Sequence, residues 1–230
     1  MFQRPFVWLV TLAMLFAVHC SVTESTNIKT GGIWARYVIE NDQGVIRAYA
    51  VLRVGGPLGT IVDLTGGEHL EVNGLRLTEW VEPVTGYRWS SRVVPEDPLG
   101  EYYFVFIRTD EEVTTLLHLP ELPLIADPVL SQLACFDEPI LVVWNTDEPG
   151  DGISVSFSGD CVDGLTYTAL PDNGEFELPG IPRAPGAVEG CSLTISVTRM
   201  YTGLQNPAFQ GGLVQQEARD SVSVDITWCD

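Results

Sequence analysis

The residues of this sequence with the most definite chemistry are its five cysteines. Four of them lie in the second half of the chain: Cys135, Cys161, Cys191 and Cys229. An even set of cysteines in an exported domain is typical of two disulfides. Zinc binding is the rival interpretation, but the sequence has no Cys-x-x-Cys pair or Cys/His cluster to hold the metal. We therefore predict two structural disulfides, no metal site and no cofactor.

Four cysteines allow three pairings, and we predict Cys161–Cys191 together with Cys135–Cys229. Cys161 follows one predicted strand and Cys191 opens another, whereas Cys135 and Cys229 bracket the second half near its two ends. Closing loops of these lengths should stabilise the fold by roughly 3 to 5 kcal/mol per bridge through chain entropy.

The fifth cysteine, Cys20, ends a predicted export signal that comprises residues 1–20. Arg4 provides the positive start of the signal, and residues 6–18 form a stretch of 13 predominantly apolar residues. This stretch is shorter than the ~20 residues that a membrane-spanning helix needs, and its length is typical of a signal-peptide core. We therefore expect the protein to leave the cytoplasm.

Residues 17–20, Ala-Val-His-Cys, resemble the lipobox of a bacterial lipoprotein, although His19 stands where a small residue is usual. Two outcomes stay open, namely lipid attachment to Cys20 or cleavage after Cys20 with the signal. We favour lipidation over a free thiol, which is a liability in an oxidising compartment. The protein is then expected in the outer membrane or periplasm as a lipoprotein, because Ser21 follows the cysteine, or otherwise as a secreted protein.

No catalytic constellation accompanies the cysteines. After the signal the sequence contains two histidines, His69 and His118, and we interpret both as structural or surface residues. It contains no nucleophile-elbow, zinc-protease or phosphate-loop motif. The acidic segments 147–151 and 160–163 lack the pattern of a calcium-binding loop, and we interpret them as solvated loops. We therefore expect a protein that is not an enzyme.

Three aromatic residues, Trp80, Tyr87 and Trp89, flank one predicted turn. If exposed, they could stack on sugar rings or on a partner; if buried, they are large core residues. Strand alternation places Tyr87 and Trp89 on the same face of one strand, and we favour core packing for the group.

The charge balance limits the partners of the protein. It has 12 basic and 31 acidic residues, which give a formal net charge of −19. A surface this acidic does not follow a phosphate backbone, so we expect no nucleic-acid partner. Negative charge also weakens adhesion to anionic lipid, so we expect membrane contact only through a lipid anchor at Cys20.

The elements that must position these residues are short strands. Residues 33–40 and 45–54 alternate around the turn 41–44, and Asn73-Gly74 separates residues 69–72 from 75–80, which indicates two hairpins. The other predicted strands are 60–64, 87–94, 101–108, 113–119, 140–144, 152–158, 165–169, 175–178, 191–200, 213–219 and 222–228. No amphipathic helix of ten or more residues follows the signal.

These strands predict an all-β fold with two antiparallel β-sandwich domains of immunoglobulin-like type after the signal peptide. Residues 120–128 contain three prolines and cannot lie in a helix or a central strand, so we place the domain junction there. The predicted organisation is therefore a signal peptide at 1–20, a first sandwich at 21–119, a connector at 120–128 and a second sandwich at 129–230 with both disulfides.

Three segments of the chain resemble two-domain envelope lipoproteins of Gram-negative bacteria: residues 17–20, the strand 103–108 that leads to Leu119-Pro120, and residues 206–212. The second half is also similar to immunoglobulin-like domains in strand number and cysteine content. It departs from antibody domains because Trp144 follows Cys135 by only nine residues and no Tyr-x-Cys precedes Cys191. The resemblance implies an envelope location and no particular activity.

Together these observations predict an exported, non-enzymatic envelope protein that binds or scaffolds an envelope protein or a glycan. Two alternatives stay open. A subunit of a surface fibre or adhesin would use an unpaired edge strand. A carbohydrate-active hydrolase would need a concave cluster of carboxylates and aromatic residues.

The Cys20→Ser variant tests the predicted lipid anchor. Lipoprotein cysteines carry enough acyl chains for stable anchoring, whereas one chain alone binds membranes only marginally. We therefore expect the wild-type protein in the membrane fraction and Cys20→Ser outside it, with the intact mass showing the added lipid. A mature protein that begins at Ser21 without lipid mass would contradict the prediction.

Overall fold

The structure is a computed structural model that describes residues 22–128, 133–135, 138–160, 162–180 and 190–227. Two 3-10 turns, η1 (Ser25–Asn27) and η2 (Thr30–Gly32), follow the first strand. The strands before the connector are β1 (Val22–Glu24), β2 (Ile33–Asp42), β3 (Val45–Val54), β4 (Thr60–Asp63), β5 (His69–Val72), β6 (Leu75–Arg76), β7 (Thr78–Val81), β8 (Arg88–Val93), β9 (Glu101–Ile107) and β10 (Glu112–His118). The later strands are β11 (Ile125–Asp127), β12 (Leu133–Cys135), β13 (Ile140–Trp144), β14 (Gly152–Gly159), β15 (Val162–Leu170), β16 (Glu175–Leu178), β17 (Cys191–Gly203) and β18 (Gly211–Thr227).

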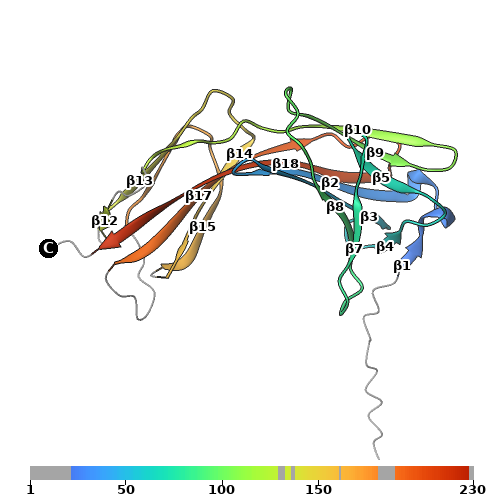
Figure 1. The fold of residues 1–230 in the computed structure, drawn as a ribbon, viewed down its shortest axis with the longest axis horizontal. Helices are drawn as coiled ribbons and strands as arrows, with labels where there is room; N and C mark the ends of the chain where they lie inside the picture. The colour runs from blue at the N-terminus through green and yellow to red at the C-terminus, as the bar shows by residue number, and fades with distance from the viewer. Residues whose placement is uncertain (1–21, 129–132, 136–137, 161, 181–189, 228–230) are drawn as a thin grey trace, which may run out of the picture.

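One large sheet runs through the whole molecule (Figure 1). Its main path has the order β1-β4-β3-β2-β18-β17-β14-β15, with the β7–β8 hairpin joined to β3 and with β12 joined to β18. Two smaller sheets, β10-β9-β5-β6 and β11-β13-β16, complete the fold. The prediction of an all-β fold of sandwich-like layers is confirmed. Most strand pairs are antiparallel, but β18 runs parallel to β2, and so do the pairs β1–β4 and β12–β18.

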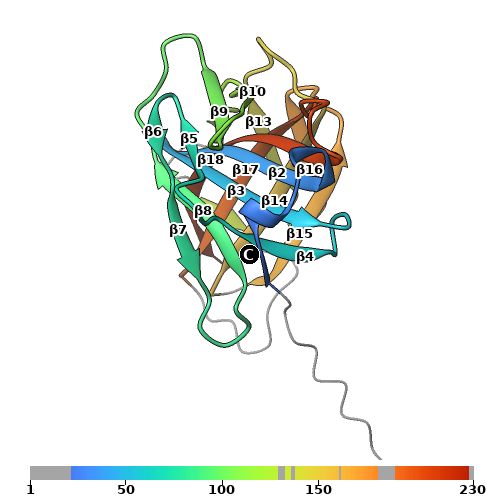
Figure 2. The ribbon, with the colours of Figure 1, turned by 90° about the vertical axis from the view of Figure 1, so that its right-hand side faces the viewer.

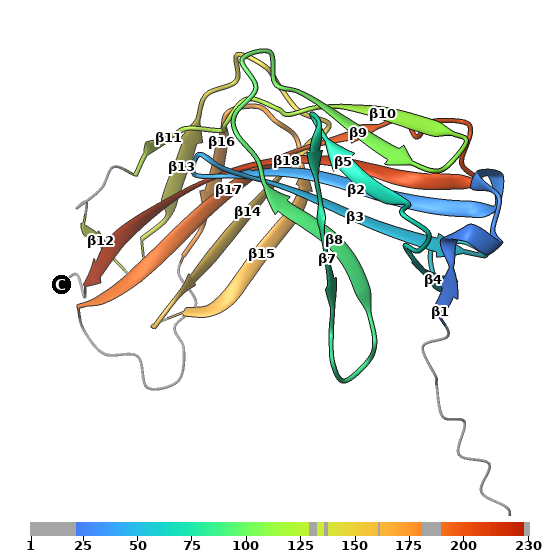
Figure 3. The ribbon, with the colours of Figure 1, turned by 45° about the vertical axis from the view of Figure 1, so that its right-hand side comes forward.

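Strand β18 contributes to both cores, because its buried side chains alternate with outward-facing ones without interruption. Val214 belongs to the first core, Val222, Val224 and Ile226 belong to the second core, and the buried Ala218 lies between them on the same side of the strand. The sequence predicted two strands here, at 213–219 and 222–228, whereas the structure has one strand of 17 residues. Both small sheets therefore cover one face of the large sheet, and no other sheet of the described residues covers the opposite face, which is the concave side of an arch (Figures 1 and 3).

Each covering sheet encloses its own core. In the first core Tyr37 packs on Phe104 with ring centroids 5.0 Å apart, and Phe209 packs against both Tyr37 and Phe106. In the second core three rings pack on one another, with centroids 6.3 Å apart for Phe157 and Tyr167, 6.2 Å for Phe157 and Phe176, and 4.8 Å for Tyr167 and Phe176. Phe209 and Val214 come from beyond the connector and yet belong to the first core. The domain division at residues 120–128 stays a prediction.

The two predicted hairpins form with the expected turns. Asp42 pairs with Val45, and Gln43 and Gly44 between them have φ values of 51° and 87°. Asn73 and Gly74 have φ values of 46° and 75°. Positive φ at both central positions is the geometry that matches the twist of antiparallel strands.

The predicted strand 75–80 is divided in the structure. Leu77 separates β6 from β7 because its side chain is buried in the first core and its N–H donates to the Leu70 carbonyl over 2.8 Å. The chain thus leaves the covering sheet at Arg76 and joins the large sheet at Thr78, where β7 and β8 form a hairpin that extends beyond the sheet (Figure 2).

A buried ion pair holds the seam between the two covering sheets. Arg199 and Asp172 have side chains that are 0% and 1% exposed, and the Arg199 Nε lies 2.6 Å from an Asp172 oxygen. The same guanidinium donates to the carbonyls of Glu121 in the connector and of Asn145 after β13. Asp172 also accepts hydrogen bonds from the Trp144 indole and from the Gly150 N–H. This network fixes the connector and two loops to β17.

The Asp172→Asn variant tests the importance of this pair. Removing one partner of a buried ion pair leaves the other charge uncompensated, so we expect the free energy of unfolding to fall by about 3 to 5 kcal/mol. Asp147→Asn in an exposed loop is the matched control and should change stability by less than about 0.5 kcal/mol. Urea denaturation of both variants is the measurement, and equal midpoints would contradict the assignment.

Acid should weaken the same network. Burial acts to raise the pKa of Asp172, but the hydrogen bonds from Arg199, Gly150 and Trp144 bring the pKa below its ordinary value of 3.8. A depressed pKa stabilises the fold above the unfolded-state pKa, and this stabilisation is lost as the pH falls through the folded-state value. The wild-type protein should therefore lose stability below about pH 4, and Asp172→Asn should lose less over that range.

The cysteine predictions fall partly outside the described residues, which exclude Cys20, Cys161 and Cys229. Cys191 begins β17 two residues before Leu193, which pairs with Gly159 at the end of β14. Cys135 on β12 pairs with Thr227 on β18. In the sequence Cys161 follows Gly159 by two residues, and Cys229 follows Thr227 by two. The pairing Cys161–Cys191 with Cys135–Cys229 stays a prediction.

Peptide mapping of the non-reduced protein tests this pairing. We expect one cross-linked peptide that contains Cys161 and Cys191 and another that contains Cys135 and Cys229, because the strand register brings their neighbours together. Mapping after reduction is the control and should release all four peptides. A peptide that links Cys135 to Cys161 would contradict the prediction.

Candidate functional site

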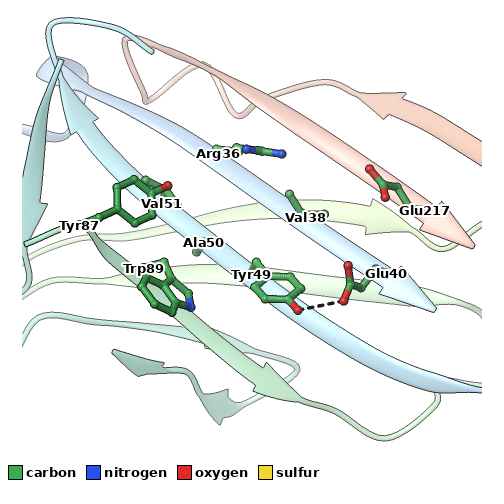
Figure 4. A pocket seen from close by; sticks show the side chains of 9 residues that line it. All are labelled: Arg36, Val38, Glu40, Tyr49, Ala50, Val51, Tyr87, Trp89 and Glu217. Carbon is green, nitrogen blue, oxygen red and sulfur yellow. Dashed lines mark hydrogen bonds between the residues drawn. The ribbon is translucent and has the colours of Figure 1, made fainter. Parts of the chain in front are cut away.

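The open face of the large sheet is hollowed over the first half of the molecule (Figure 4). The pocket holds about 270 Å³, and four segments of the sheet contribute side chains to it. Its lining consists of Arg36, Val38 and Glu40 from β2, Tyr49, Ala50 and Val51 from β3, Tyr87 and Trp89 at β8, and Glu217 from β18. We call this hollow the aromatic pocket.

Strand register explains why these residues meet. Val38 pairs with Tyr49 across β2 and β3, and Glu40 pairs with Glu217 across β2 and β18. In a strand the side chains point alternately to opposite faces, so Tyr49 and Val51 point away from Ala48, Ala50 and Leu52, which enter the first core. Ala50 reaches the pocket only at its floor. One face of each strand builds the core, and the other builds the pocket.

The aromatic side of the pocket is an open platform. The rings of Tyr87 and Trp89 lie 5.9 Å apart with an angle of 32° between their planes. The Arg53 guanidinium lies 5.5 Å from the centre of the Tyr87 ring, which favours a fixed ring position. Trp80 pairs with Trp89 across the β7–β8 hairpin and is 51% exposed.

The interpretation of these aromatic residues as core residues is wrong. Tyr87 and Trp89 are half-buried and lie outside both cores, and Trp80 is exposed. Strand β8 is part of the large sheet, and its face that carries Tyr87 and Trp89 lies on the uncovered side of that sheet. These rings therefore meet solvent and not a covering sheet. The alternative that the sequence left open, stacking on a sugar ring or a partner, fits this position.

Polar side chains surround the platform. The Tyr49 hydroxyl donates to Glu40 Oε1 over 2.9 Å, and Arg47 Nη1 lies 3.7 Å from the same oxygen. Burial, followed by the hydrogen bond to Glu40, raises the pKa of Tyr49, so the hydroxyl stays protonated and keeps donating at neutral pH. Arg36 donates through Nε and Nη2 to the Gln215 side-chain oxygen over 3.1 and 2.8 Å.

This arrangement suits binding by stacking and hydrogen bonding. The rings offer apolar faces, while guanidinium and carboxylate groups at the rim offer donors and acceptors in fixed positions. A pocket of this type, apolar in the middle with a few convergent polar groups, is the usual form of a small-ligand site. Among the residues that the structure describes, no histidine, cysteine or serine lines the pocket as a possible nucleophile or its base.

The residues singled out in the sequence lie elsewhere. Cys135 lies on β12, and Cys191 on β17 belongs to the second core and not to the aromatic pocket. His69 on β5 lies with Nδ1 2.9 Å from the Gly67 carbonyl oxygen and with Nε2 3.0 Å from Glu71 Oε1, outside the aromatic pocket. In the acidic segment 147–151, Asp151 accepts a hydrogen bond from the Thr202 N–H. Within the described part of the chain, no group of three or more His, Cys, Asp or Glu residues is arranged to hold a metal ion.

The sequence singled out Tyr87 and Trp89, although as core residues, and it did not place Glu40 or Glu217 beside them. Alternation in residues 45–54 already placed Arg47, Tyr49, Val51 and Arg53 on one face. Glu217 lies far along the chain, and only the parallel pairing of β18 with β2 brings it to Glu40.

Comparisons with known proteins assign no family. No protein-family model matches the chain, and no curated protein matches it. Among solved structures, SGBP-B of the mixed-linkage glucan utilization locus of Bacteroides ovatus, in complex with a heptasaccharide, is 8% identical, with 99% of this chain and 71% of that chain covered and a TM-score of 0.23. A structure of titin is 13% identical, with 86% of this chain and 99% of that chain covered and a TM-score of 0.23. Within the described residues, no helix is long and apolar enough to cross a membrane.

Proposed function

We propose that this protein is an exported, non-catalytic binding module and that the aromatic pocket binds a carbohydrate. The observation that carries the proposal is the half-buried pair Tyr87 and Trp89, held 5.9 Å apart outside both cores on an open sheet face. Aromatic faces complement the apolar face of a sugar ring, and large rigid rings contribute contact area at a low cost in conformational entropy.

The polar rim supports a sugar ligand over a purely apolar one. Sugar hydroxyls both donate and accept hydrogen bonds, and the rim offers both kinds of partner in the Arg36 guanidinium and the Glu40 and Glu217 carboxylates. An acidic sugar would meet two carboxylates and a chain of net charge −19. The proposed ligand is therefore uncharged.

Export belongs to the proposal and rests on the sequence. The predicted signal at residues 1–20 would deliver the protein to the envelope, where a lipid at Cys20 would keep it at the membrane. The whole signal, Cys20 included, lies outside the described residues.

The Trp89→Ala variant tests carbohydrate binding. Gels that contain hydroxyethylcellulose, xylan, galactomannan or polygalacturonate should retard the wild-type protein with at least one of the three neutral polymers and not with the acidic one. Loss of a central stacking ring should weaken that binding by about tenfold or more. Tyr103→Ala removes an exposed ring from the covering sheet and is the matched control, which should bind like the wild type.

Three outcomes decide against the proposal. Wild-type mobility that no polymer changes would show that the pocket is not a carbohydrate site of this kind. Equal binding by Trp89→Ala and the wild type would place the site elsewhere. Release of reducing sugar that is lost in Glu217→Gln would replace binding with hydrolysis, for which the facing carboxylates Glu40 and Glu217 are the specific candidates.

A further inference from the structure

The open face of the large sheet continues beyond the aromatic pocket into a field of hydroxyl groups. One row crosses four neighbouring strands, and its members pair directly in the strand register: Thr166 on β15, Ser156 on β14, Ser196 on β17 and Ser221 on β18. Because paired residues point to the same face, all four hydroxyls lie on the side opposite the second core.

Two further rows flank the first one. Ser158, Thr194 and Ser223 pair across β14, β17 and β18 on one side. On the other side Ser154 pairs with Thr198, which pairs with Arg219. We call these three rows, without Arg219, the hydroxyl field.

The hydroxyl field is uncharged in a strongly acidic protein. The chain has 31 acidic residues, and yet the rows described above carry a single charged side chain, that of Arg219. Ser158, Thr166 and Ser223 are exposed, Thr198 is buried, and the other members of the field are half-buried. A surface of hydroxyls complements a ligand that is itself rich in hydroxyls and has no charge.

The hydroxyls are held in place by one another. The Ser221 hydroxyl donates to Ser196 Oγ over 2.8 Å, and Thr194 Oγ1 lies 3.3 Å from Ser223 Oγ. Arg219 Nε donates to Thr198 Oγ1 over 3.1 Å. Such pairs leave each group with further capacity to donate or accept, because a hydroxyl has one hydrogen and two lone pairs.

A second hollow connects the aromatic pocket to the hydroxyl field. It shares Glu40 and Glu217 with the aromatic pocket and extends past Arg219 to Thr198, the first hydroxyl residue. The concave side of the arch therefore carries a path from β8 across β3, β2 and β18 to β17 (Figure 3).

We infer that the ligand of this face is a long, unbranched, uncharged polysaccharide, held at the aromatic pocket and continued over the hydroxyl field. This inference rests on the proposed function and specifies its ligand. Neighbouring strands are about 4.8 Å apart, which is close to the length of one sugar residue along a chain. A chain that crosses the strands along one row thus meets the hydroxyl of a new strand at about each sugar residue.

Chain length is the property that separates this inference from simple sugar binding. We compare hydroxyethylcellulose with cellotetraose by affinity gel and by calorimetry, using the wild type and the double variant Ser156→Ala/Ser196→Ala. The wild type should bind the polymer about tenfold more tightly per site than the tetrasaccharide, because two or more hydrogen bonds of modest net strength are added. The double variant should lose that tenfold difference and keep its affinity for cellotetraose.

Controls keep the outcomes distinct. Thr114→Ala removes an exposed hydroxyl from β10 on a covering sheet and should leave both affinities unchanged. Trp89→Ala should weaken both ligands, since it acts at the shared pocket.

Unchanged polymer affinity in Ser156→Ala/Ser196→Ala would overturn the inference while the proposed function stands. Failure of the wild type to bind either saccharide would overturn the inference, and the proposed function would fall as well only if xylan and galactomannan also left the protein unretarded. A concentration-dependent dimer of the wild type that the double variant abolishes would assign the face to a second copy of the chain, and would overturn the inference as well.

Discussion

Unbroken alternation along β18 decides the architecture of this protein. The strand has 17 residues, and its buried apolar side chains, those of Val214, Ala218, Val222, Val224 and Ile226, all point to one face. A shift of one residue would turn every later side chain to the other face, so the strand cannot end one sheet and begin another without a break in the pattern. Both cores must consequently form on the same side of a single sheet. The opposite side is left without a covering layer.

Polar residues on the covered side mark where one core ends and the other begins. Gln216 accepts a hydrogen bond from the His118 N–H at the end of β10, and Asp220 accepts one from the Ile125 N–H at the start of β11. Arg199 on the neighbouring strand β17 lies in the same zone and binds the connector through the Glu121 carbonyl. Buried backbone groups of a connector need partners, and these three side chains supply them. The seam between the two cores is thus polar because the connector that crosses it has backbone groups without strand partners, and side chains must bind them.

The uncovered face explains both the aromatic pocket and the hydroxyl field. Side chains on that face have no core to enter, so their composition is free to serve a ligand. The two parts of the face differ in chemistry, with rings and charged groups near β8 and hydroxyls near β14. The arch brings them onto one concave surface (Figure 1). A binding site on a sheet gains rigidity from the hydrogen-bonded strands beneath it, which reduces the entropy lost when a ligand is fixed.

The sequence by itself determined the elements that depend on neighbours along the chain. Period-two alternation and the turn residues Gln43-Gly44 and Asn73-Gly74 gave the hairpins, because turn geometry and strand period are local properties. The all-β class follows for the same reason, and so does the placement of Tyr87 and Trp89 on one face. Only the tertiary structure decided which face is covered. Alternation shows that a strand has two different faces, but the sequence pattern of an aromatic face is the same whether that face packs on a core or meets solvent. The continuity of β18, its parallel pairing with β2, and the approach of Glu217 to Glu40 join segments that lie far apart in the chain. Their contacts depend on how the two small sheets share one large sheet, and no local pattern records that choice.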